Sequence, residues 1–460
     1  MRYKTVIGKK HIVLTAVFAI YMSIYMICLI YIDKNSYELA GAGIVLHYLK
    51  MPAFAVGMLL FPLVQRLQTG ERARRLHLIG TCIVFAAGLL IQSGLLFKPT
   101  LSVYIASCII VLISLGLLGG SVYYHFAMGF VNHPYLGRMS GIGGAAAFLV
   151  QVSVQNLFSL DIALLVLLLL GFAFAVYTSI ISKERFEWMF DEPLEYAKQG
   201  DPSLPKTKVI ITGTVGMMLL YLICGLTDAV IVSRNFAGDM SAYSWIRLFG
   251  AVGYLTGGFI ADVCRRKWLM ISALGITILS IPLPFMFNEG YSLPATCLFY
   301  IILVSQIELL NVFFWDLAPK TSHPQLFAGM SRVLSCLSEV ILLLFSGVSV
   351  MTDLIFEAAL AAAVILCIAF GGYIPSLASK DEKSSDGSTA PFDDFVTRHG
   401  LTPRETDILR LLIDSDDEVA VMASNMNISA RSVYRHINSI YEKTGTETRY
   451  ALMRYYYQNK

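Results

Sequence analysis

Twelve apolar stretches, each about as long as a helix that crosses a bilayer, constrain this chain more than any other feature. A membrane-spanning helix needs about 20 mostly apolar residues to cross the hydrocarbon core. Hydrophobic residues make up 56% of the 460 residues and charged residues only 15%, against about 25% charged in a soluble domain. The stretches lie roughly at residues 11–32, 40–64, 76–97, 101–126, 139–158, 161–182, 209–232, 243–263, 268–287, 293–318, 326–350 and 353–374.

The connections between these stretches are short, except for the polar segment 183–208. This segment divides the predicted body, residues 1–375, into two halves of six spans each, 1–182 and 209–375. We therefore predict an all-α fold, a polytopic membrane helix bundle of about twelve helices. All eight cysteines lie in or beside apolar stretches, and none forms the paired spacing of a zinc site. The sequence thus predicts no metal site and no cofactor.

Basic residues in the loops predict how the body is oriented. The loops on the side of the N-terminus hold eighteen Lys and Arg, whereas the opposite loops hold only Lys34, Lys98 and Arg234. Cytoplasmic loops carry an excess of Lys and Arg, so we expect a cytoplasmic N-terminus. An even number of spans returns the C-terminus to the same side. The expected location is the cell (inner, cytoplasmic) membrane, with the lipid bilayer as the partner of the body.

One loop carries a motif in addition to its charge. The segment Gly257–Lys267, GGFIADVCRRK, places Asp262 and a basic cluster between two predicted spans. Together with the six-plus-six layout, it resembles the major facilitator family and its loop motif G-x-x-x-D-(R/K)-x-G-(R/K)-(R/K). The chain departs from that motif at Val263, where the family has a basic residue, and it lacks the second glycine. The resemblance implies a facilitator-like body.

Polar and ionisable side chains inside predicted spans give the candidate ligand site. Such residues are costly in a bilayer and tend to mark function. A cavity that holds a cation, carboxylates and aromatic rings can bind a small polar or aromatic molecule. The alternative is internal ion pairing between helices, or long side chains that reach the membrane surface. The ligand-binding candidates are His47, Lys50, Arg247, Glu308, Asn311, Trp315, Arg332 and Glu339.

Beyond residue 375 the pattern becomes that of a soluble chain. Residues 376–393 are rich in Ser, Asp, Lys and Gly without periodicity, which indicates a flexible linker. Residues 394–460 form a small helical unit. Thr402 and Glu405 have the spacing of a capping box at the start of its first helix. No catalytic constellation is visible in either part, so we do not expect an enzyme.

A later helix of this unit has clear boundaries and two distinct faces. Ser429 can cap its start and Gly445 can end it. Val433, Ile437 and Ile440 recur at helical spacing and are expected to face inward. This arrangement leaves the polar side chains between them on the outer face.

The unit resembles the LuxR-type (GerE-like) helix-turn-helix domain, which has four helices. The residues in register with that family are LTPRETDIL at 401–409, Ala423, Ile428, Ser429, Val433, His436, Ile440, Lys443 and Gly445. The resemblance implies that the third helix enters the major groove of double-stranded DNA and that the fourth mediates dimerisation. By this resemblance the DNA-binding candidates are Ser429, Arg431, Ser432, Tyr434, Arg435, His436, Asn438 and Lys443. Tyr434 replaces the usual basic residue of the family, and His436 could instead be a packing residue at the inner edge.

The charge of this unit predicts weak binding by a single copy. Residues 394–460 contain nine Lys and Arg and nine Asp and Glu. Neutralisation of phosphates supplies most of the non-specific affinity for DNA. A dimer on a palindromic site is therefore the expected binding form.

Two functions remain from the sequence. The first is a membrane-integrated, one-component transcriptional regulator that senses a small molecule through its membrane body and binds promoter DNA through its C-terminal unit. The second is a secondary transporter with a regulatory helix-turn-helix tail. Uptake of a ligand by a chain without its tail would favour the second.

Overall fold

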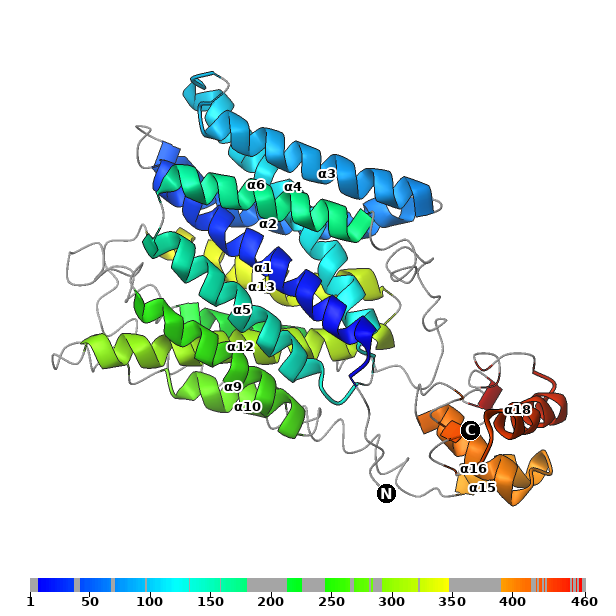
Figure 1. Ribbon diagram of the computed structural model, residues 1–460. Helices are drawn as coiled ribbons and strands as arrows, with labels where there is room; N and C mark the ends of the chain where they lie inside the picture. The colour runs from blue at the N-terminus through cyan, green and yellow to red at the C-terminus, as the bar shows by residue number, and fades with distance from the viewer. Residues whose placement is uncertain are drawn as a thin grey trace. The chain divides into compact units, whose positions relative to one another are not determined.

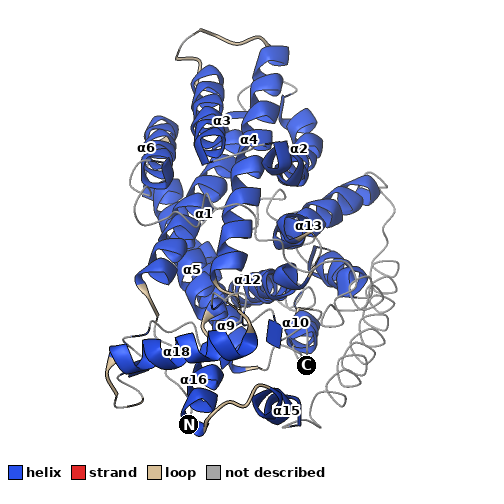
Figure 2. Cartoon of the chain, turned by 90° about the vertical axis from the view of Figure 1, so that its right-hand side faces the viewer, coloured by secondary structure: helices blue, strands red, loops and turns tan. Residues whose placement is uncertain are grey.

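The computed structural model is all helical in the residues it describes, with no strand among them (Figure 2). The described residues are 7–36, 42–67, 71–95, 97–131, 133–157, 159–179, 213–225, 245–264, 269–280, 283, 292–321, 323–346, 390–414, 419, 422–423, 426, 428–446, 449, 452 and 455–456. The chain divides into two compact units, Val6–Pro375 and a second unit that contains Ser376–Lys460. The predicted all-α class is confirmed.

The first half of the body consists of six long helices (Figure 1). Each lies on one of the six predicted spans. Five of them are at least 22 residues long and α6 has 20, so their lengths match the thickness of a hydrocarbon core. They are α1 (Lys9–Ser36), α2 (Ala42–Leu67), α3 (Glu71–Gln92), α4 (Leu101–Gly129), α5 (Leu136–Leu157) and α6 (Leu160–Ser179).

The second half follows the same plan in the residues that are described. A helix at Gly213–Gly225 lies on the seventh predicted span. The further elements are η2 (Trp245–Leu248), α9 (Phe249–Val263), α10 (Leu269–Ile278), α12 (Ser292–Leu317), η4 (Ala318–Lys320) and α13 (Pro324–Ser346). The predicted loop 183–208 and the predicted span 353–374 lie outside the described residues.

Two helix pairs make the most extensive contacts between the halves of the body. α5 packs along α9, and α2 packs along α13. Counted by span, α5 is the fifth helix and α9 the eighth, while α2 is the second and α13 the eleventh. Each helix of one pair therefore lies six spans from a helix of the other pair. The α5–α9 contact is close because glycines line it: a Cβ atom on Gly258 would collide with the backbone carbonyl of Gly137. Small residues allow such backbone approach in membrane helices.

Five of the described helices are long and apolar enough to cross a membrane by length and composition. They are Lys10–Asp33, Arg75–Gln92, Leu101–Gly129, Trp245–Val263 and Leu293–Lys320. Apolar side chains also remain exposed on the outside of the body, among them Ile83, Leu165, Phe172 and Phe259. An outer surface of this kind is suited to lipid.

The C-terminal unit has its own hydrophobic core. Its helices are α15 (Ala390–Arg398), α16 (Pro403–Asp414) and α18 (Ala430–Thr444). Ile408 and Leu409 from α16 pack with Val433 and Ile440 from α18, and all four are fully buried. The inward stripe predicted for α18 is thereby confirmed, because its apolar residues recur every three or four positions.

Helix α15 begins inside the stretch predicted as a linker, residues 376–393. Phe395 on α15 is buried, and its ring lies 5.1 Å from that of Tyr456 near the end of the chain. Pro391 stands in the first turn of the helix, where a missing N–H costs nothing. The polar composition before residue 394 concealed this helix, since its apolar contacts are made with residues far along the sequence.

Candidate functional site

The start and end of α18 are fixed by the capping residues that the sequence indicates. Ser429 has extended backbone angles, and its Oγ accepts a hydrogen bond from the backbone N–H of Ser432 at 3.2 Å. Gly445 closes the helix in the left-handed region, with φ 66°. A glycine has no Cβ to oppose that conformation. These caps set which side chains of α18 face outward.

Four of the DNA-binding candidates share the outer face of α18. Arg431, Tyr434, Arg435 and Asn438 follow one another at intervals of three, one and three residues, so they lie on one side of a helix. All four are exposed, and Tyr434 is 57% exposed. The face presents two guanidinium groups, a phenol and an amide. Guanidinium groups bind phosphates and guanine edges, and amides can pair with adenine.

Lys443 lies off the outer face of α18 and pairs with Glu405 of α16. Its Nζ donates to Oε2 of Glu405 at 2.7 Å and to the backbone oxygen of Gly400 at 3.1 Å. These bonds join the last turn of α18 to the first turn of α16. The structure therefore places Lys443 away from the outer face of α18 and in contact with the start of α16. No local sequence pattern indicates this pair, because the two residues are 38 positions apart.

Glu405 receives several hydrogen bonds at this junction. Its Oε2 accepts from the backbone N–H of Thr402 at 2.7 Å, which confirms the predicted capping box, and its Oε1 accepts from Oγ of Ser439 at 2.6 Å. Burial alone would raise the pKa of this carboxyl. The hydrogen bonds from Lys443, Ser439 and Thr402 outweigh that effect and lower the pKa of Glu405 to about 2.

The remaining DNA-binding candidates of the C-terminal unit lie at the edge of the outer face. Ser429 is exposed, and Ser432 and His436 are half-buried. Ser432 exchanges hydrogen bonds with Ser429, so both hydroxyls already serve the cap. The half-buried ring of His436 is compatible with a contact to DNA and with packing at the inner edge of the helix, the two interpretations made from the sequence.

The ligand-binding candidates of the body fall into two groups. Glu308, Asn311, Trp315 and Arg332 come together on α12 and α13 in one buried cluster, and each is at most 8% exposed. We call these four residues with their polar neighbours Ser140, Tyr123, Tyr221 and Ser331 the buried polar cluster. Its members come from both halves of the body, since Tyr123 and Ser140 belong to α4 and α5.

A chain of hydrogen bonds runs through this cluster. Oγ of Ser140 donates to Oε1 of Glu308, which ties α5 to α12. Oγ of Ser331 donates to Oδ1 of Asn311 at 2.8 Å, and the hydroxyls of Ser331 and Tyr221 lie 2.7 Å apart. Buried polar groups need such partners, because an unmade hydrogen bond costs roughly 1–3 kcal/mol. The bond of Ser140 with Glu308 holds the two halves in one relative arrangement, whereas the bonds of Ser331 join helices within the second half.

Aromatic rings surround the cationic end of the cluster. Nε of Arg332 donates to the hydroxyl of Tyr123 at 3.0 Å, and the guanidinium carbon lies 5.1 Å from the ring centre of Tyr25. The indole of Trp315 lies 5.3 Å from the ring of Tyr123 and 5.5 Å from that of Phe18. Sequence reasoning missed the two tyrosines, since a Tyr inside an apolar stretch looks like any packing residue.

The other candidates do not join this cluster. Lys50 forms an ion pair with Asp33 at 3.1 Å, and Arg247 lies in η2 at the start of α9, 5.7 Å from the ring centre of Tyr300. Glu339 is half-buried two turns after Arg332 on α13. The side chain of His47 lies outside the described residues. For Lys50, the alternative of internal ion pairing describes the observed contact.

Asp262 of the loop motif caps a helix of the opposite half. Its two carboxylate oxygens accept from the backbone N–H groups of Gly137 at 2.8 Å and Arg138 at 2.7 Å, in the first turn of α5. A negative charge at a helix N-terminus is favourable because the first N–H groups have no partner within the helix. Asp262 therefore stabilises the contact of α9 with α5.

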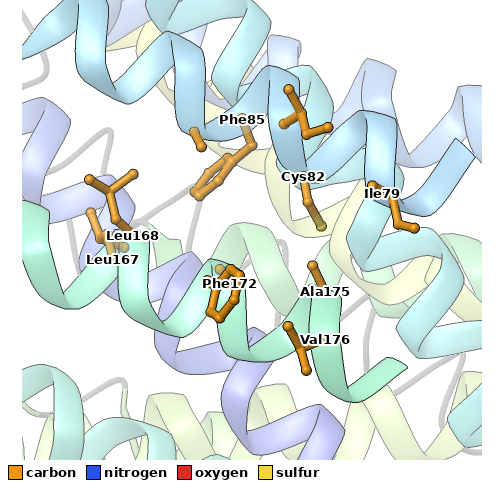
Figure 3. Close-up of a pocket in the computed structure, with 11 residues that line it drawn as sticks. Ile79, Cys82, Phe85, Leu167, Leu168, Phe172, Ala175 and Val176 are labelled. Atoms are coloured by element: carbon orange, nitrogen blue, oxygen red, sulfur yellow. The ribbon is translucent and has the colours of Figure 1, made fainter. Parts of the chain in front are cut away.

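An apolar cavity of about 310 Å³ lies between α3 and α6 (Figure 3). Cys82 and Phe85 from α3 and Phe172 and Ala175 from α6 stand on opposite sides of it. Its lining residues are all apolar, and its helices belong to the outer part of the first half. Such a wall is suited to hydrocarbon chains.

Comparisons with known proteins agree with this division of the chain. Residues 399–456 match the family described as bacterial regulatory proteins, luxR family (GerE). The body is similar to the crystal structure of the E. coli fucose:proton symporter FucP, with 14% identity and a TM-score of 0.54, over 79% of this chain and 97% of that one. It is also similar to the human organic anion transporter MFSD10 (TETRAN), with 14% identity and a TM-score of 0.52, over 81% of this chain and 99% of that one. No curated protein sequence matches the chain.

The fold and the C-terminal match define the class of the molecule. It is a multi-pass membrane protein whose body has a facilitator-like fold and whose C-terminal region is a LuxR-type helix-turn-helix domain. The helix-turn-helix domain implies binding to DNA. Both resemblances indicated by the sequence are confirmed. At 14% identity the structural likeness concerns the fold alone.

Proposed function

We propose that the chain is a membrane-integrated, one-component transcriptional regulator. The observation that carries this proposal is the presence, in one polypeptide, of a facilitator-type body and a helix-turn-helix unit whose α18 exposes Arg431 and Arg435. The C-terminal unit, which we call the reader, binds promoter DNA. The body binds a small molecule at the buried polar cluster. The linker that precedes α15 tethers the reader to the body.

Signal transfer uses two arrangements of the halves of the body. A ligand shifts an equilibrium only if it binds one arrangement better than the other. The contacts that must change are those between the halves, among them α5 with α9 and α2 with α13. Bonds such as Ser140–Glu308 and Gly137–Asp262 cross between the halves, so they bias the equilibrium toward the arrangement seen here.

The tether makes binding as a pair favourable. Reader units held at one membrane meet at a higher effective concentration than free units do. This compensates for the net charge of zero over residues 394–460, which weakens binding by a single copy. We infer a dimer of the reader on double-stranded DNA. Both termini face the cytoplasm, as the excess of Lys and Arg in the loops on one side supports.

Selection of DNA by the full chain tests the proposal. The protein in lipid nanodiscs is incubated with random duplexes, and bound duplexes are sequenced over several rounds. Enrichment of a two-fold symmetric motif is expected. The same protein with Arg431→Ala and Arg435→Ala should enrich none, whereas Arg398→Ala on α15 should behave as the unchanged chain. Enrichment of no motif by the unchanged chain would contradict the proposal.

One observation favours a second function, that of a secondary transporter with a regulatory tail. Glu308 is fully buried in α12 and bonds to Ser140 of the other half. Such a carboxyl can exchange a proton as the halves move. Uptake of a labelled solute by a chain ending at residue 389, lost in Glu308→Gln, would favour transport.

A further inference from the structure

The buried polar cluster contains a cation that forms no ion pair with the described residues. Arg332 is 8% exposed, and the described residues give it one hydrogen bond, to Tyr123, and one aromatic face, that of Tyr25. None of the ion pairs in the described part of the chain includes Arg332. A buried charge without a partner is strongly unfavourable in a protein interior. The neutral phenol of Tyr123 does not remove this charge.

A further donor beside Arg332 lacks an acceptor. The Nε1 atom of Trp315 is buried and has no hydrogen-bond partner among the described residues. Trp315 is 1% exposed. Its indole contacts the ring of Tyr123, whose hydroxyl also binds Arg332. Two side chains that can only donate hydrogen bonds, Arg332 and Trp315, therefore lie beside the same tyrosine.

The distribution of acceptors along α12 limits the charge of a ligand. Glu308, Asn311 and Trp315 follow one another at intervals of three and four residues, so they lie on one face of the helix. Seven residues separate Glu308 from Trp315, which is about 10 Å along the helix axis. A single negative charge fits the donors near Trp315, whereas a second one at the other end of a ligand would meet the carboxyl of Glu308.

We infer that the buried polar cluster binds a small organic monocarboxylate. Its carboxylate accepts hydrogen bonds from the guanidinium of Arg332 and the indole N–H of Trp315, and the rings of Tyr123 and Phe18 cover its apolar part. The inference rests on the proposed function, since it names the ligand class for the same site. It also explains why these donors are kept inside a membrane body.

Binding requires that the halves separate at the cluster. Trp315 is packed by Phe18, Phe126 and Tyr123, which belong to α1 and α4 of the first half. A monocarboxylate therefore favours an arrangement in which α12 and α13 have moved away from α1 and α4. This gives the ligand the difference in affinity between two arrangements that regulation needs.

The test compares anions with neutral and cationic analogues on the full chain in nanodiscs. The probes are acetate, benzoate and indole-3-acetate, the primary amide of each, benzylamine, and the dicarboxylate terephthalate. Thermal unfolding and tryptophan fluorescence report binding. We expect at least one monocarboxylate to raise the melting temperature in a saturable way. Its amide, the amine and the dicarboxylate should not do so.

Variants locate the binding. Arg332→Gln should weaken the affinity for that carboxylate at least about tenfold, because a hydrogen bond to a charged group is lost. Trp315→Phe should weaken the affinity for the carboxylate by a smaller factor and remove the change in tryptophan fluorescence. Arg247→Gln is the matched control, since it also removes a partly buried arginine, one that lies beside Tyr300 and not at the cluster. It should leave the affinity unchanged.

Several results would overturn the inference. The first is that the amides or benzylamine stabilise the protein as much as the acids do. The second is that none of the carboxylates shifts the melting temperature more than its amide. The third is that Arg332→Gln binds the carboxylate with unchanged affinity. The comparison of acids with amides needs no variant, so a poorly folded Arg332→Gln protein does not spoil the test. DNA selection on the same preparation separates the two proposals. Carboxylate binding without motif enrichment would refute regulation and leave the ligand class intact.

Discussion

The Nζ atom of Lys443 lies 2.7 Å from Oε2 of Glu405, so the last turn of α18 is joined to the first turn of α16. The carboxyl of Glu405 is almost completely buried, and it also holds Thr402 and Ser439. One side chain thus closes the cap of α16 and fixes the orientation of the helix that presents Arg431 and Arg435. The stability and the DNA-binding surface of the reader depend on the same bond.

Glu405→Gln should destabilise the reader by about 2–3 kcal/mol, because a buried charged hydrogen bond to Lys443 is lost and the amide cannot accept as many donors. Chemical denaturation of the C-terminal unit measures this free energy of unfolding. Asp407→Asn is the matched control, since Asp407 is an exposed carboxylate on the same helix. It should change stability by less than about 0.5 kcal/mol. Equal effects of the two substitutions would show that general charge, and not this contact, is responsible.

The pKa of Glu405 predicts how the stability of the reader depends on pH. The folded state lowers this pKa from 4.5 to about 2. The resulting stabilisation is complete above pH 4.5 and is lost as the pH falls from 4.5 to about 2. A shift of this size corresponds to about 3 kcal/mol. Unfolding curves over this range should show the loss in the unchanged unit, and Glu405→Gln should flatten it. If Glu405→Gln lost as much stability over this pH range, the loss would belong to other groups.

The arginines on the outer face of α18 should determine affinity for DNA without affecting the fold. Arg431→Ala and Arg435→Ala are each expected to weaken binding to a selected duplex by roughly 10–100-fold, and to reduce the slope of affinity against salt by about one where the lost contact is to a phosphate. Titration at several salt concentrations measures both. Their exposed positions predict an unchanged melting temperature. A lower melting temperature would mean that the arginines support the fold.

Tyr434 should influence which bases are preferred more than how tightly DNA is bound. It is 57% exposed between the two arginines and carries no charge. Tyr434→Ala should therefore leave the salt slope unchanged while altering the selected motif at one or two positions, each by about 1–3 kcal/mol in preference. Sequencing of selected duplexes for both proteins makes the comparison. An unchanged motif would place Tyr434 outside the base-contacting set.

The contact between α5 and α9 should not tolerate a larger residue. In Gly258→Ala the new Cβ would meet the backbone of Gly137, so the helices must separate at a cost of about 1–3 kcal/mol. Thermal unfolding of the full chain in nanodiscs should show a lower melting temperature. Gly275→Ala on α10 is the control, because no atom lies within 4 Å of the added Cβ. A similar melting temperature for both variants would mean that the halves are not held at Gly258.

Local patterns made much of the fold predictable. The positions of Thr402, Ser429 and Gly445 were expected as helix boundaries, since capping depends on neighbours within three residues. The buried stripe that contains Val433 followed from spacing alone. Apolar length likewise predicted the helices of the body. In each case the physical cause lies within a few turns of the chain.

The candidate sites were less predictable because their contacts are distant in sequence. The partner of Lys443 is 38 residues away, and the partner of Arg332 is 209 residues away. Lys50 was expected to line a ligand site, but it contacts Asp33, a charge at the end of the preceding helix. Asp262 was recognised by its motif, yet its bonds to Gly137 and Arg138 required the packing of α9 on α5.

The most direct test of the central proposal is the occupancy of DNA by the full chain in cells, measured together with transcripts. Cells expressing the unchanged protein and cells expressing the Arg431→Ala, Arg435→Ala double variant are compared by crosslinking and sequencing. We predict a small set of promoters bound only by the unchanged protein, with changed transcripts from the adjoining genes. Identical occupancy and identical transcripts in the two strains would contradict the account of this chain as a regulator.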